Sequence, residues 1–572
     1  MSDVISAGQA HGGQLINLYA QGASLAAAKE QAKHNLSWDL TKRQMCDIEL
    51  LLNGAFSPLE GFMGEADYNT VLDNMRLADG TLWPMPITLD VSASFAEQIS
   101  SGQTITLRDA EGVVIANMTV GDCWRPDKTR EAEAVFGSSK DCHPGVHYLN
   151  AEAGDYYLGG RLVGVTPPLY YDFKQYRDSP ASLRAKFASW GWNNVIALQT
   201  RNPMHRAHVI MTKRLMAENN ANFVIHTAVG MTKPGDLDHY CRVRCYEKVL
   251  KRYPASSAQL SLVPLGMRMA GPREALWQAI IRQNYGFSHF VVGHDHAGPG
   301  LNDEGCAFYT PEASQQLVLS FQDELNIKVL PAPFLLYAQG REEFCEQGQL
   351  LPGEEGLYIS GAELREILKR GDEVPDWFAF PEIVEELQHT MPPRSKQGFT
   401  VFFTGLSGSG KSTLANGLMV RLRERGGRHV TLLDGDVVRK NLSSELSFSK
   451  EHRELNIQRI GYVASEITRN GGVAICAPIA PYLAGRRSVR NLIAGVGTFI
   501  EIHVSTPIEV CEGRDRKGLY AMARAGKVKG FTGIDDPYQE PENPEMRIDT
   551  SQHEMAEAIE MVMARLESIG VI

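Results

Sequence analysis

Long apolar runs are absent from this chain of 572 residues. No stretch reaches the roughly 18 consecutive apolar residues that a membrane-spanning helix needs. The first residues also lack a charged segment followed by an apolar one, which is the pattern of a secretion signal. We therefore expect a cytoplasmic protein that does not interact with a membrane.

Cysteine is scarce, with nine residues scattered over the whole chain. Such a distribution does not form a disulfide framework. Cys241 and Cys245 stand close together, but no second pair lies near them in the sequence. Reduced structural thiols are therefore favoured over a zinc site, which stays as the alternative.

Positive charge is in deficit, because 57 Lys and Arg residues face 68 Asp and Glu residues, a net charge of −11. This balance argues against nucleic-acid binding by bulk electrostatics but leaves room for local pockets that bind small phosphates. Hydrophobic residues make up 43% of the chain and charged residues 22%, as in ordinary globular proteins. At about 150 residues a domain, the length predicts three or four domains.

One stretch predicts phosphate binding directly. The sequence Gly405-Leu-Ser-Gly-Ser-Gly-Lys-Ser-Thr413 follows an apolar strand-like run and precedes an amphipathic helical pattern, as in a P-loop. Its backbone N–H groups and the helix N-terminus would hold phosphate oxygens, Lys411 would reach the β- and γ-phosphates, and Ser412 would ligate Mg²⁺. The predicted ATP-binding residues of this loop are Gly405, Gly408, Ser409, Gly410, Lys411, Ser412 and Thr413.

The N-terminal residues 1–168 read as a β-rich domain. Residues 84–91, 104–108 and 112–116 have the composition of strands, and 109–112 has that of a hairpin turn. Helical signal is limited to the neighbourhoods of 16–32 and 47–52. No catalytic constellation is visible in this part.

A βαβ unit follows, with a buried strand at 194–198, a polar segment at 199–208, a helix over 209–219 and a second strand at 222–226. Such a unit places ligands at the carboxyl ends of its parallel strands. His205 and His208 lie on one face at the helix start, beside Arg201 and Asn202. Phosphate binding is favoured over a structural role or a metal pair for these histidines.

The decapeptide from Gln199 to His208 resembles the signature of ATP sulfurylase, a nucleotidylyltransferase that joins sulfate to the α-phosphate of ATP. Met267–Ala275 and Gly293–Gly300 support the resemblance, which extends over roughly residues 1–390. It implies a PUA-like domain over 1–168 and a Rossmann-like H-x-x-H nucleotidylyltransferase domain over 169–390.

The resemblance also implies roles for individual residues. Gln199, Arg201 and the backbone of Ala297 would bind sulfate, and Thr200, Arg201 and Asn202 would form the catalytic loop. His205 and His208 would stabilise the transition state. The residues implied to contact ATP are Gln199, Asn202, Gly293, His294, Asp295, His296 and, by a looser match, Leu335.

His294 departs from the family, which has arginine there. The exchange replaces a permanent fork of donors with a titratable ring that supplies less phosphate stabilisation when neutral. We therefore hypothesise that the sulfurylase activity is reduced or altered.

A short basic segment with two prolines, 391–397, reads as a linker before a C-terminal domain at 398–572. Downstream of the P-loop, the apolar strand 430–433 ends in Asp434 and Asp436. An acidic residue there could instead bond a ribose in a dinucleotide-binding domain, but the Lys411-Ser412 pair favours a magnesium-linked or proton-accepting carboxylate.

This half resembles adenylylsulfate kinase, which transfers the γ-phosphoryl group of MgATP to the 3′-hydroxyl of adenylyl sulfate. The resemblance implies a parallel sheet, with Asp436 as the base or metal-linked carboxylate and Lys411 in catalysis. Arg514 would belong to a lid over the phosphates. The residues implied to bind the acceptor are Arg439, Phe448, Arg453, Asn456, Ile479, Lys517 and Phe531.

Together the two halves predict an α/β multidomain enzyme with ATP, sulfate, adenylyl sulfate and pyrophosphate as ligands and Mg²⁺ as the metal. The first alternative is a kinase alone, with a silent sulfurylase-like domain in a regulatory or assembly role. The second is a sulfurylase that works in reverse to make ATP. We also expect a homo-oligomer, a dimer or larger.

Overall fold

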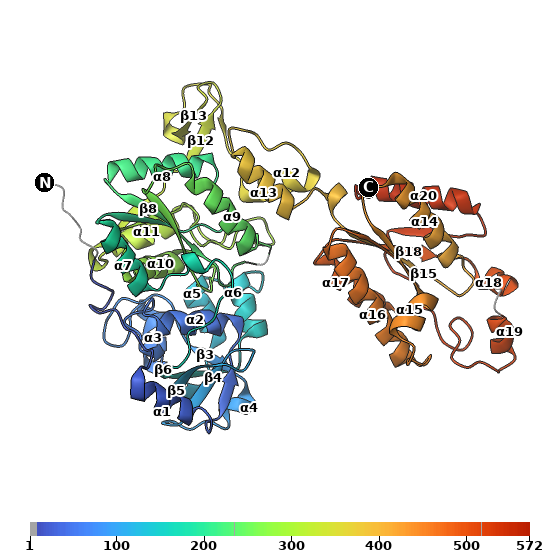
Figure 1. Cartoon of the computed structure of the whole chain (residues 1–572), viewed down its shortest axis with the longest axis horizontal. Coiled ribbons are helices and arrows are strands. Elements are labelled where there is room, and N and C mark those ends of the chain that lie inside the picture. Colours follow the sequence, from blue (N-terminus) through green and yellow to red (C-terminus); the bar gives the residue numbers. More distant parts are fainter. Residues whose placement is uncertain (1–7, 234, 516–517) are drawn as a thin grey trace. The chain divides into compact units, whose positions relative to one another are not determined.

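The computed structural model describes residues 8–233, 235–515 and 518–572, which form two compact units. One unit comprises the chain up to Gly361 together with Val374–Glu386, and the other comprises Ala362–Glu373 and Leu387–Ile572 (Figure 1). The domain boundaries proposed after residues 168, 390 and 397 stay predictions. Within the described ranges, no helix combines the length and apolar character needed to cross a membrane.

The N-terminal part is built on a mixed, mostly antiparallel sheet in the order β1-β4-β5-β6-β2, with β3 added to β6. Its strands are β1 Ser37–Asp39, β2 Gly61–Phe62, β3 Leu89–Val91, β4 Thr104–Arg108, β5 Val114–Trp124 and β6 Tyr156–Gly164. Its helices are α1 Gly22–Gln31, α2 Lys42–Leu52, α3 Glu65–Asn74, α4 Ala93–Ala96, α5 Lys128–Phe136 and α6 Pro144–His147.

Most of the predicted N-terminal strands are confirmed, with one large change of length. The strand at 104–108 is confirmed, and the one predicted at 112–116 begins at Val114. The strand predicted at 84–91 is reduced to Leu89–Val91, because Pro84 and Pro86 have no N–H to give to a neighbouring strand. Helices α3 and α5 were not predicted.

A second, wholly parallel sheet has the order β11-β10-β7-β8-β9. Its strands are β7 Val195–Leu198, β8 Asn222–Ala228, β9 Ala258–Val263, β10 His289–Val292 and β11 Lys328–Pro331. The accompanying helices are α7 Pro180–Trp190, α8 Arg206–Glu218, α9 His239–Leu250, α10 Gly271–Tyr285 and α11 Ala313–Ser320. Because the strand order reverses between β7 and β10, the crevice beyond their carboxyl ends is the expected ligand position.

Both sheets of this unit share one hydrophobic core. Phe56 of the N-terminal part packs on Trp277 of α10, with ring centroids 5.1 Å apart. Arg268 and Asp47 form a buried ion pair of 2.6 Å between the same two parts. A small antiparallel sheet follows, with β12 Leu335–Ala338, β13 Glu343–Glu346 and β14 Gly356–Leu357; the next helices are α12 Gly361–Arg370 and α13 Pro381–Thr390.

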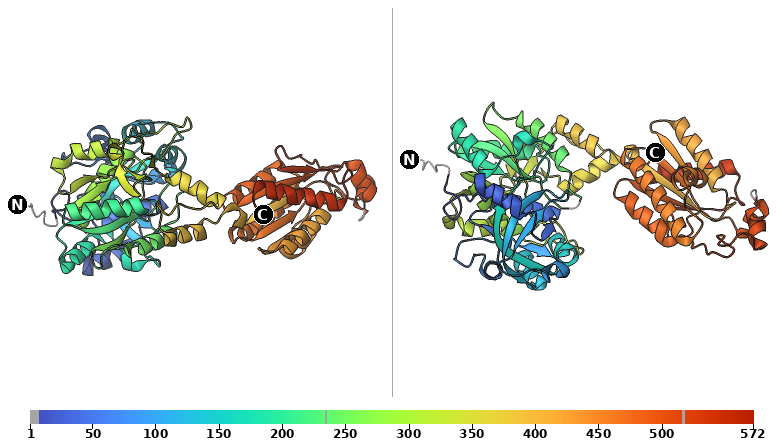
Figure 2. Two further views of the ribbon diagram at one scale, coloured as in Figure 1. Left: turned by 90° about the horizontal axis from the view of Figure 1, so that it is seen from above. Right: turned by 60° about the horizontal axis from the view of Figure 1, so that its bottom comes forward.

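The C-terminal unit holds a parallel sheet in the order β16-β17-β15-β18-β19, with helices on both faces (Figure 2). Its strands are β15 Phe399–Thr404, β16 Val430–Asp434, β17 Val473–Ala477, β18 Thr498–Val504 and β19 Met546–Ile548. Its helices are α14 Lys411–Arg425, α15 Gly435–Leu442, α16 Lys450–Arg469, α17 Leu483–Ala494, α18 Ile508–Arg514, α19 Leu519–Arg524 and α20 Met555–Ile569.

The central strand β15 is apolar on both sides because both of its faces are covered. Val401 and Phe403 join the core made with α14 and α20, whereas Phe402 joins the core made with α16 and α17. Gly461 on α16 permits this second layer to be thin, since a Cβ there would lie 2.6 Å from Val489 of α17.

A buried ion pair joins α17 to β18. Arg486 lies 2.9 Å from Glu501, and its other nitrogens donate to the carbonyls of Ala480 and Gln539. The side chain of Arg486 is 1% exposed. The pair therefore ties helix, sheet and the segment before β19 together from inside.

The Arg486→Met substitution is expected to lower the free energy of unfolding of the C-terminal unit by about 3 kcal/mol, because it leaves buried Glu501 short of a partner. Hydrogen exchange of the β18 amides measures this loss. Arg487→Met is the control, since the pair of Arg487 with Glu542 is exposed and is expected to contribute less than about 1 kcal/mol. Equal exchange rates in the two variants would contradict the prediction.

Candidate functional site

The first candidate site lies at the switch point between β7 and β10. Gln199 directly follows β7, is buried, and accepts hydrogen bonds at Oε1 from the N–H of Ala228 at 3.0 Å and from Nη2 of Arg282 at 2.9 Å. Its amide nitrogen lies 3.7 Å from the sulfur of Met267. These contacts therefore hold the Gln199 amide in one orientation.

The next residues form a tight loop fixed from the neighbouring strand. The Thr200 hydroxyl and the Asn202 backbone bond each other, and Thr227 of β8 donates to the Thr200 carbonyl at 2.8 Å. Tyr246 of α9 donates to the carbonyls of both Thr200 and Asn202. Hydrogen bonds from Thr227 and Tyr246 to its carbonyls thus fix the loop that is predicted to be catalytic.

Arg201 connects this loop to the loop after β10. One guanidinium nitrogen lies 3.1 Å from a carboxylate oxygen of Asp236, and another donates to the carbonyl of Gly298 at 3.0 Å. The structure therefore brings Arg201 into contact with the residue that follows Ala297, and the sulfate site itself stays a prediction. Ala297 has a φ of 55°, a left-handed conformation that an alanine rarely adopts.

The rings of His205 and His208 lie next to each other at the start of α8, with centroids 3.9 Å apart and planes tilted by 46°. His205 stacks on Phe378 at 4.6 Å. Burial lowers the pKa of His208 to about 4 and that of His205 well below its usual value, with the neighbouring ring adding to the second shift. The His205 N–H donates to Nδ1 of His208 at 3.3 Å, so the hydrogen of this neutral ring is on Nε2.

The loop after β10 contains the remaining predicted nucleotide contacts. The Gly293 N–H donates to Nδ1 of His296 at 3.3 Å, and Nε2 of His296 donates to Gln278 at 3.0 Å. Asp295 lies so close to Gly298 that a Cβ on this glycine would be 1.9 Å from its carboxylate. A side chain at position 298 would require the Asp295 carboxylate to move.

His294 lies near an acidic neighbour. Its Nδ1 lies 3.9 Å from a carboxylate oxygen of Glu312, and its ring packs near Phe334 at 5.6 Å. Leu335, predicted by a loose match, directly follows Phe334 at the start of β12. The contact near His294 is thus made by Phe334, the residue before Leu335.

Several side chains around this site were missed at the sequence level. Asp236 pairs with Arg201, and Lys233 donates to the carbonyl of Pro299. Both follow β8 just as Gln199 follows β7, so the carboxyl end of the neighbouring strand was the available signal. Arg282 and Phe378 come from distant positions, and no local pattern marks them.

The second candidate site is the P-loop between β15 and α14. Gly405, Gly408 and Gly410 have φ values of 149°, 77° and 102°, which let the backbone turn its N–H groups inward. Ser409 is buried, whereas Ser412 and Thr413 are exposed on the first turn of α14.

Lys411 and Ser412 have internal partners in this loop. Lys411 donates to the carbonyl of Leu406 at 2.6 Å, and its burial lowers its pKa to about 8. Ser412 donates to Asp434 at 2.8 Å, and Asp434 accepts the N–H of Asp436 at 3.0 Å. A hydroxyl and a carboxylate oxygen therefore meet at the end of β16.

The predicted acceptor residues surround the same edge of the sheet. The Arg439 guanidinium lies 4.4 Å from the ring centre of Phe448, which is 66% exposed. Arg453 connects several of these segments. It donates to the Phe448 carbonyl at 2.9 Å and pairs with Asp536 at 2.8 Å. It also donates to the carbonyl of Gly530, next to Phe531.

Three other predicted residues are placed less directly. Asn456 is buried on α16, and the carbonyl of Ile479 accepts from Thr404 at 2.7 Å. Arg514, expected in a lid, donates to the carbonyl of Gly408 and to Thr550. Lys517 lies outside the described residues.

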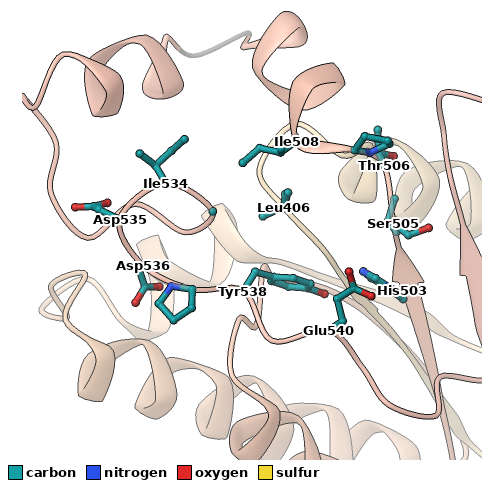
Figure 3. A pocket seen from close by; sticks show the side chains of 14 residues that line it. Leu406, His503, Ser505, Thr506, Ile508, Ile534, Asp535, Asp536, Tyr538 and Glu540 are labelled. Atoms are coloured by element: carbon teal, nitrogen blue, oxygen red, sulfur yellow. The ribbon is translucent and has the colours of Figure 1, made fainter.

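A hollow of about 620 Å³ adjoins the P-loop (Figure 3). Leu406 of the P-loop, Ile508 and Tyr538 line it, together with the acidic pair at 535 and 536. The acids have internal partners, because Asp535 accepts the backbone N–H groups of Gly530 and Phe531 and Asp536 pairs with Arg453. The hollow is therefore lined largely by apolar and already bonded groups.

The possible zinc pair, Cys241 and Cys245, lies buried on α9. Within the described residues, no group of three or more His, Cys, Asp and Glu side chains gathers in a way that could hold a metal ion. Its hydrogen bond with Cys241 and its burial raise the pKa of the Cys245 thiol. Two reduced structural thiols account for these observations.

Family models match three consecutive parts of the chain. The PUA-like domain matches residues 8–167, ATP-sulfurylase matches 174–390 and adenylylsulphate kinase matches 397–549. The predicted resemblances and fold class are thereby confirmed. The matched segments contain both candidate sites described above.

Several relatives match the chain over nearly its whole length. A sulfate adenylyltransferase from Mycosarcoma maydis is 49% identical over 569 residues, covering 98% of this chain and 99% of that protein. One from Chaetomium globosum is 48% identical over 566 residues, with the same coverage. A solved hexameric APS kinase from Thiobacillus denitrificans is 37% identical, covers 99% of both chains and superposes with a TM-score of 0.81. The chain belongs to the sulfate adenylyltransferase family and is an enzyme with an ATP-sulfurylase domain and an adenylylsulphate kinase domain.

Proposed function

We propose that the chain converts ATP and sulfate to adenylyl sulfate and pyrophosphate and then phosphorylates the 3′-hydroxyl of adenylyl sulfate with MgATP. The observation that carries the proposal is the position of both candidate sites, each at the carboxyl edge of a parallel sheet with its predicted anion-binding residues gathered there. The names of the whole-length relatives support the first reaction, and the kinase domain supports the second.

In the first reaction a sulfate oxygen attacks the α-phosphorus of ATP while the bond to pyrophosphate breaks. Arg201, the amide nitrogen of Gln199 and the N–H of Ala297 would hold the sulfate. His205 and His208 would donate hydrogen bonds as neutral rings to the negative charge that grows on the α-phosphate oxygens. No covalent nucleophile is needed, because positioning and electrostatic stabilisation can supply the rate.

In the second reaction the 3′-hydroxyl of adenylyl sulfate attacks the γ-phosphorus of ATP, and Asp436 would take its proton. Lys411 would leave the carbonyl of Leu406 to contact the β- and γ-phosphates. The hydroxyl of Ser412 and the carboxylate of Asp434, 2.8 Å apart, are the oxygen ligands that Mg²⁺ prefers. The ion, when bound with ATP, would neutralise phosphate charge.

The acceptor would sit between Phe448 and Phe531, with its phosphosulfate near Arg439, Arg453 and Asn456. An aromatic ring binds a planar base at little conformational cost. Arg453 would have to exchange its bond to Asp536 for the ligand. The hexameric relative supports self-association of this chain as well.

A kinase without sulfurylase activity is the second candidate. The relative that matches 99% of both chains is named as an APS kinase, and His294 stands beside Glu312 where the family has arginine. The intact segment from Gln199 to His208 favours the bifunctional enzyme.

Pyrophosphate release decides between the two candidates. In a Lys411→Ala chain supplied with ATP, sulfate and pyrophosphatase, we expect phosphate production that depends on sulfate. Adding Arg201→Ala should lower it at least about a hundredfold, since a charged sulfate contact is lost. No release from the folded Lys411→Ala chain, with normal phosphorylation of supplied adenylyl sulfate by the unmutated chain, would establish the kinase-only function.

The His294→Arg substitution is expected to raise the sulfurylase kcat/KM by about tenfold, because arginine supplies permanent donors to a phosphate. Steady-state pyrophosphate release measures the change. Glu312→Gln is the companion variant and tests whether the carboxylate 3.9 Å from His294 opposes phosphate binding. An unchanged kcat/KM in His294→Arg would contradict the prediction that the histidine lowers sulfurylase activity.

The kinase reaction should weaken as the pH rises through about 8, the pKa to which burial lowers Lys411. The charged form of Lys411 is present below this pH and is lost above it, so kcat/KM for ATP should fall about tenfold for each further pH unit. Lys411→Arg keeps its charge and should show no such decline, whatever its absolute rate. A flat wild-type profile up to pH 9.5 would contradict the prediction.

A further inference from the structure

One face of α10 carries three polar residues four positions apart, Glu274, Gln278 and Arg282, which we call the α10 ridge. Side chains with this spacing lie one above another on a helix. All three have no exposed surface. A buried polar group is costly unless it is bonded, so the partners of the ridge show what it does.

Arg282 controls the orientation of Gln199. Its Nη2 donates to Oε1 of Gln199 at 2.9 Å, and the N–H of Ala228 donates to the same oxygen at 3.0 Å. Two donors on the oxygen leave the NH₂ group of the amide facing the other way. The amide nitrogen lies 3.7 Å from the sulfur of Met267, so one N–H is engaged there and the other is what Gln199 can offer to an anion: a donor, not an acceptor.

Arg282 also carries a charge that has no direct ion-pair partner in the described part of the chain, although Glu274 on the same helix acts on it electrostatically. Its remaining bonds go to the carbonyls of His226 and Gln278. Burial lowers its pKa to about 9, which still leaves it charged at neutral pH. An anion bound at Gln199 would compensate this buried charge.

Gln278 controls the loop after β10. Its Oε1 accepts from Nε2 of His296 at 3.0 Å, and its amide nitrogen donates to Glu274 at 3.1 Å. Because Nε2 of His296 carries the hydrogen, Nδ1 is free to accept the N–H of Gly293 at 3.3 Å. The ridge therefore fixes one tautomer of His296 and, through it, the first residue of the loop.

Glu274 anchors the ridge at its other end. One carboxylate oxygen accepts the backbone N–H groups of Arg268 and Ala270, and the other accepts from Gln278. Each bond along the ridge has one possible direction. A change at one position therefore leaves a specific partner unsatisfied.

We propose that the α10 ridge positions the two halves of the sulfurylase site separately: Arg282 sets the Gln199 donor for sulfate, and Gln278 sets His296 and Gly293 for the nucleotide. This inference rests on the proposed sulfurylase function. Neither Arg282 nor Gln278 touches a reacting atom, so both are positioning residues.

A split of kinetic constants tests the proposal in the full-length chain. Arg282→Met is expected to raise KM for sulfate at least about tenfold and to leave KM for ATP within about twofold. Gln278→Leu should do the reverse, with KM for ATP raised at least about tenfold. Arg282→Lys keeps the charge and one donor and should restore part of the sulfate affinity.

Matched controls come from the same helix. Gln283 is buried next to Arg282 but bonds Gln9 and Asn326, and Arg273 donates only to backbone carbonyls of the N-terminal part. Gln283→Leu and Arg273→Met should leave both constants within about twofold of the parent. Hydrogen exchange of the β7 and β8 amides, which lie in the same unit as α10, reports that each variant is folded.

Equal changes of both constants in each ridge variant, or the same split in the controls, would overturn the proposal. If the parent chain releases no pyrophosphate, equilibrium dialysis in the Lys411→Ala background replaces the kinetics, using labelled ATP, and labelled sulfate with α,β-methylene ATP. The same split in dissociation constants would then reject the proposed function and keep the role of the ridge. Its absence would reject both.

Discussion

The carboxyl edges of two parallel sheets determine where the anions of this enzyme can bind. At one edge the chain leaves β7 and β10 in opposite directions, and at the other it leaves the central strand β15 through a glycine loop. Each edge is followed by a helix, α8 or α14, whose N-terminus carries a partial positive charge. Because the whole chain carries a net charge of −11, its overall field does not favour phosphates. Local donors at these two edges must supply the attraction.

The sequence predicted the parts of this arrangement that depend on neighbouring residues. The P-loop, the β7–loop–α8 unit and the parallel sheets follow from glycine spacing and apolar periodicity. The partners that hold the loops come from far along the chain, as Arg282 does for Gln199 and Phe378 for His205. No local pattern encodes such pairs, because they exist only after the sheet has formed. The shortened β3 shows the opposite case. Pro84 and Pro86 were local signals against a strand at 84–88, but the prediction followed the apolar composition of the segment instead.

In the free protein, the cations expected to bind anions already have partners. Arg201 pairs with Asp236, Arg453 pairs with Asp536, and Lys411 donates to the carbonyl of Leu406. A buried cation without a partner would cost several kcal/mol, so the free state needs these contacts. A ligand must displace these contacts or share them. The free energy of binding is therefore the difference between the bonds made with the ligand and the bonds lost within the protein. This exchange keeps the affinity below what the number of donors alone would suggest.

The two sites differ in how they meet this cost. At the sulfurylase site the pair His205 and His208 is neutral and the α10 ridge is buried, and hydrogen bonds to Gln199, His208 and His296 would fix the directions of their donors before sulfate arrives. The kinase site instead leaves the Phe448 ring 66% exposed, and Arg453 joins Phe448 to the segment at Gly530. A small tetrahedral anion offers few contacts, and discrimination against other anions depends on donors that do not rearrange. A nucleotide is large enough to stabilise a closed conformation by its own contacts, so an exposed ring and exchangeable ion pairs suit its entry.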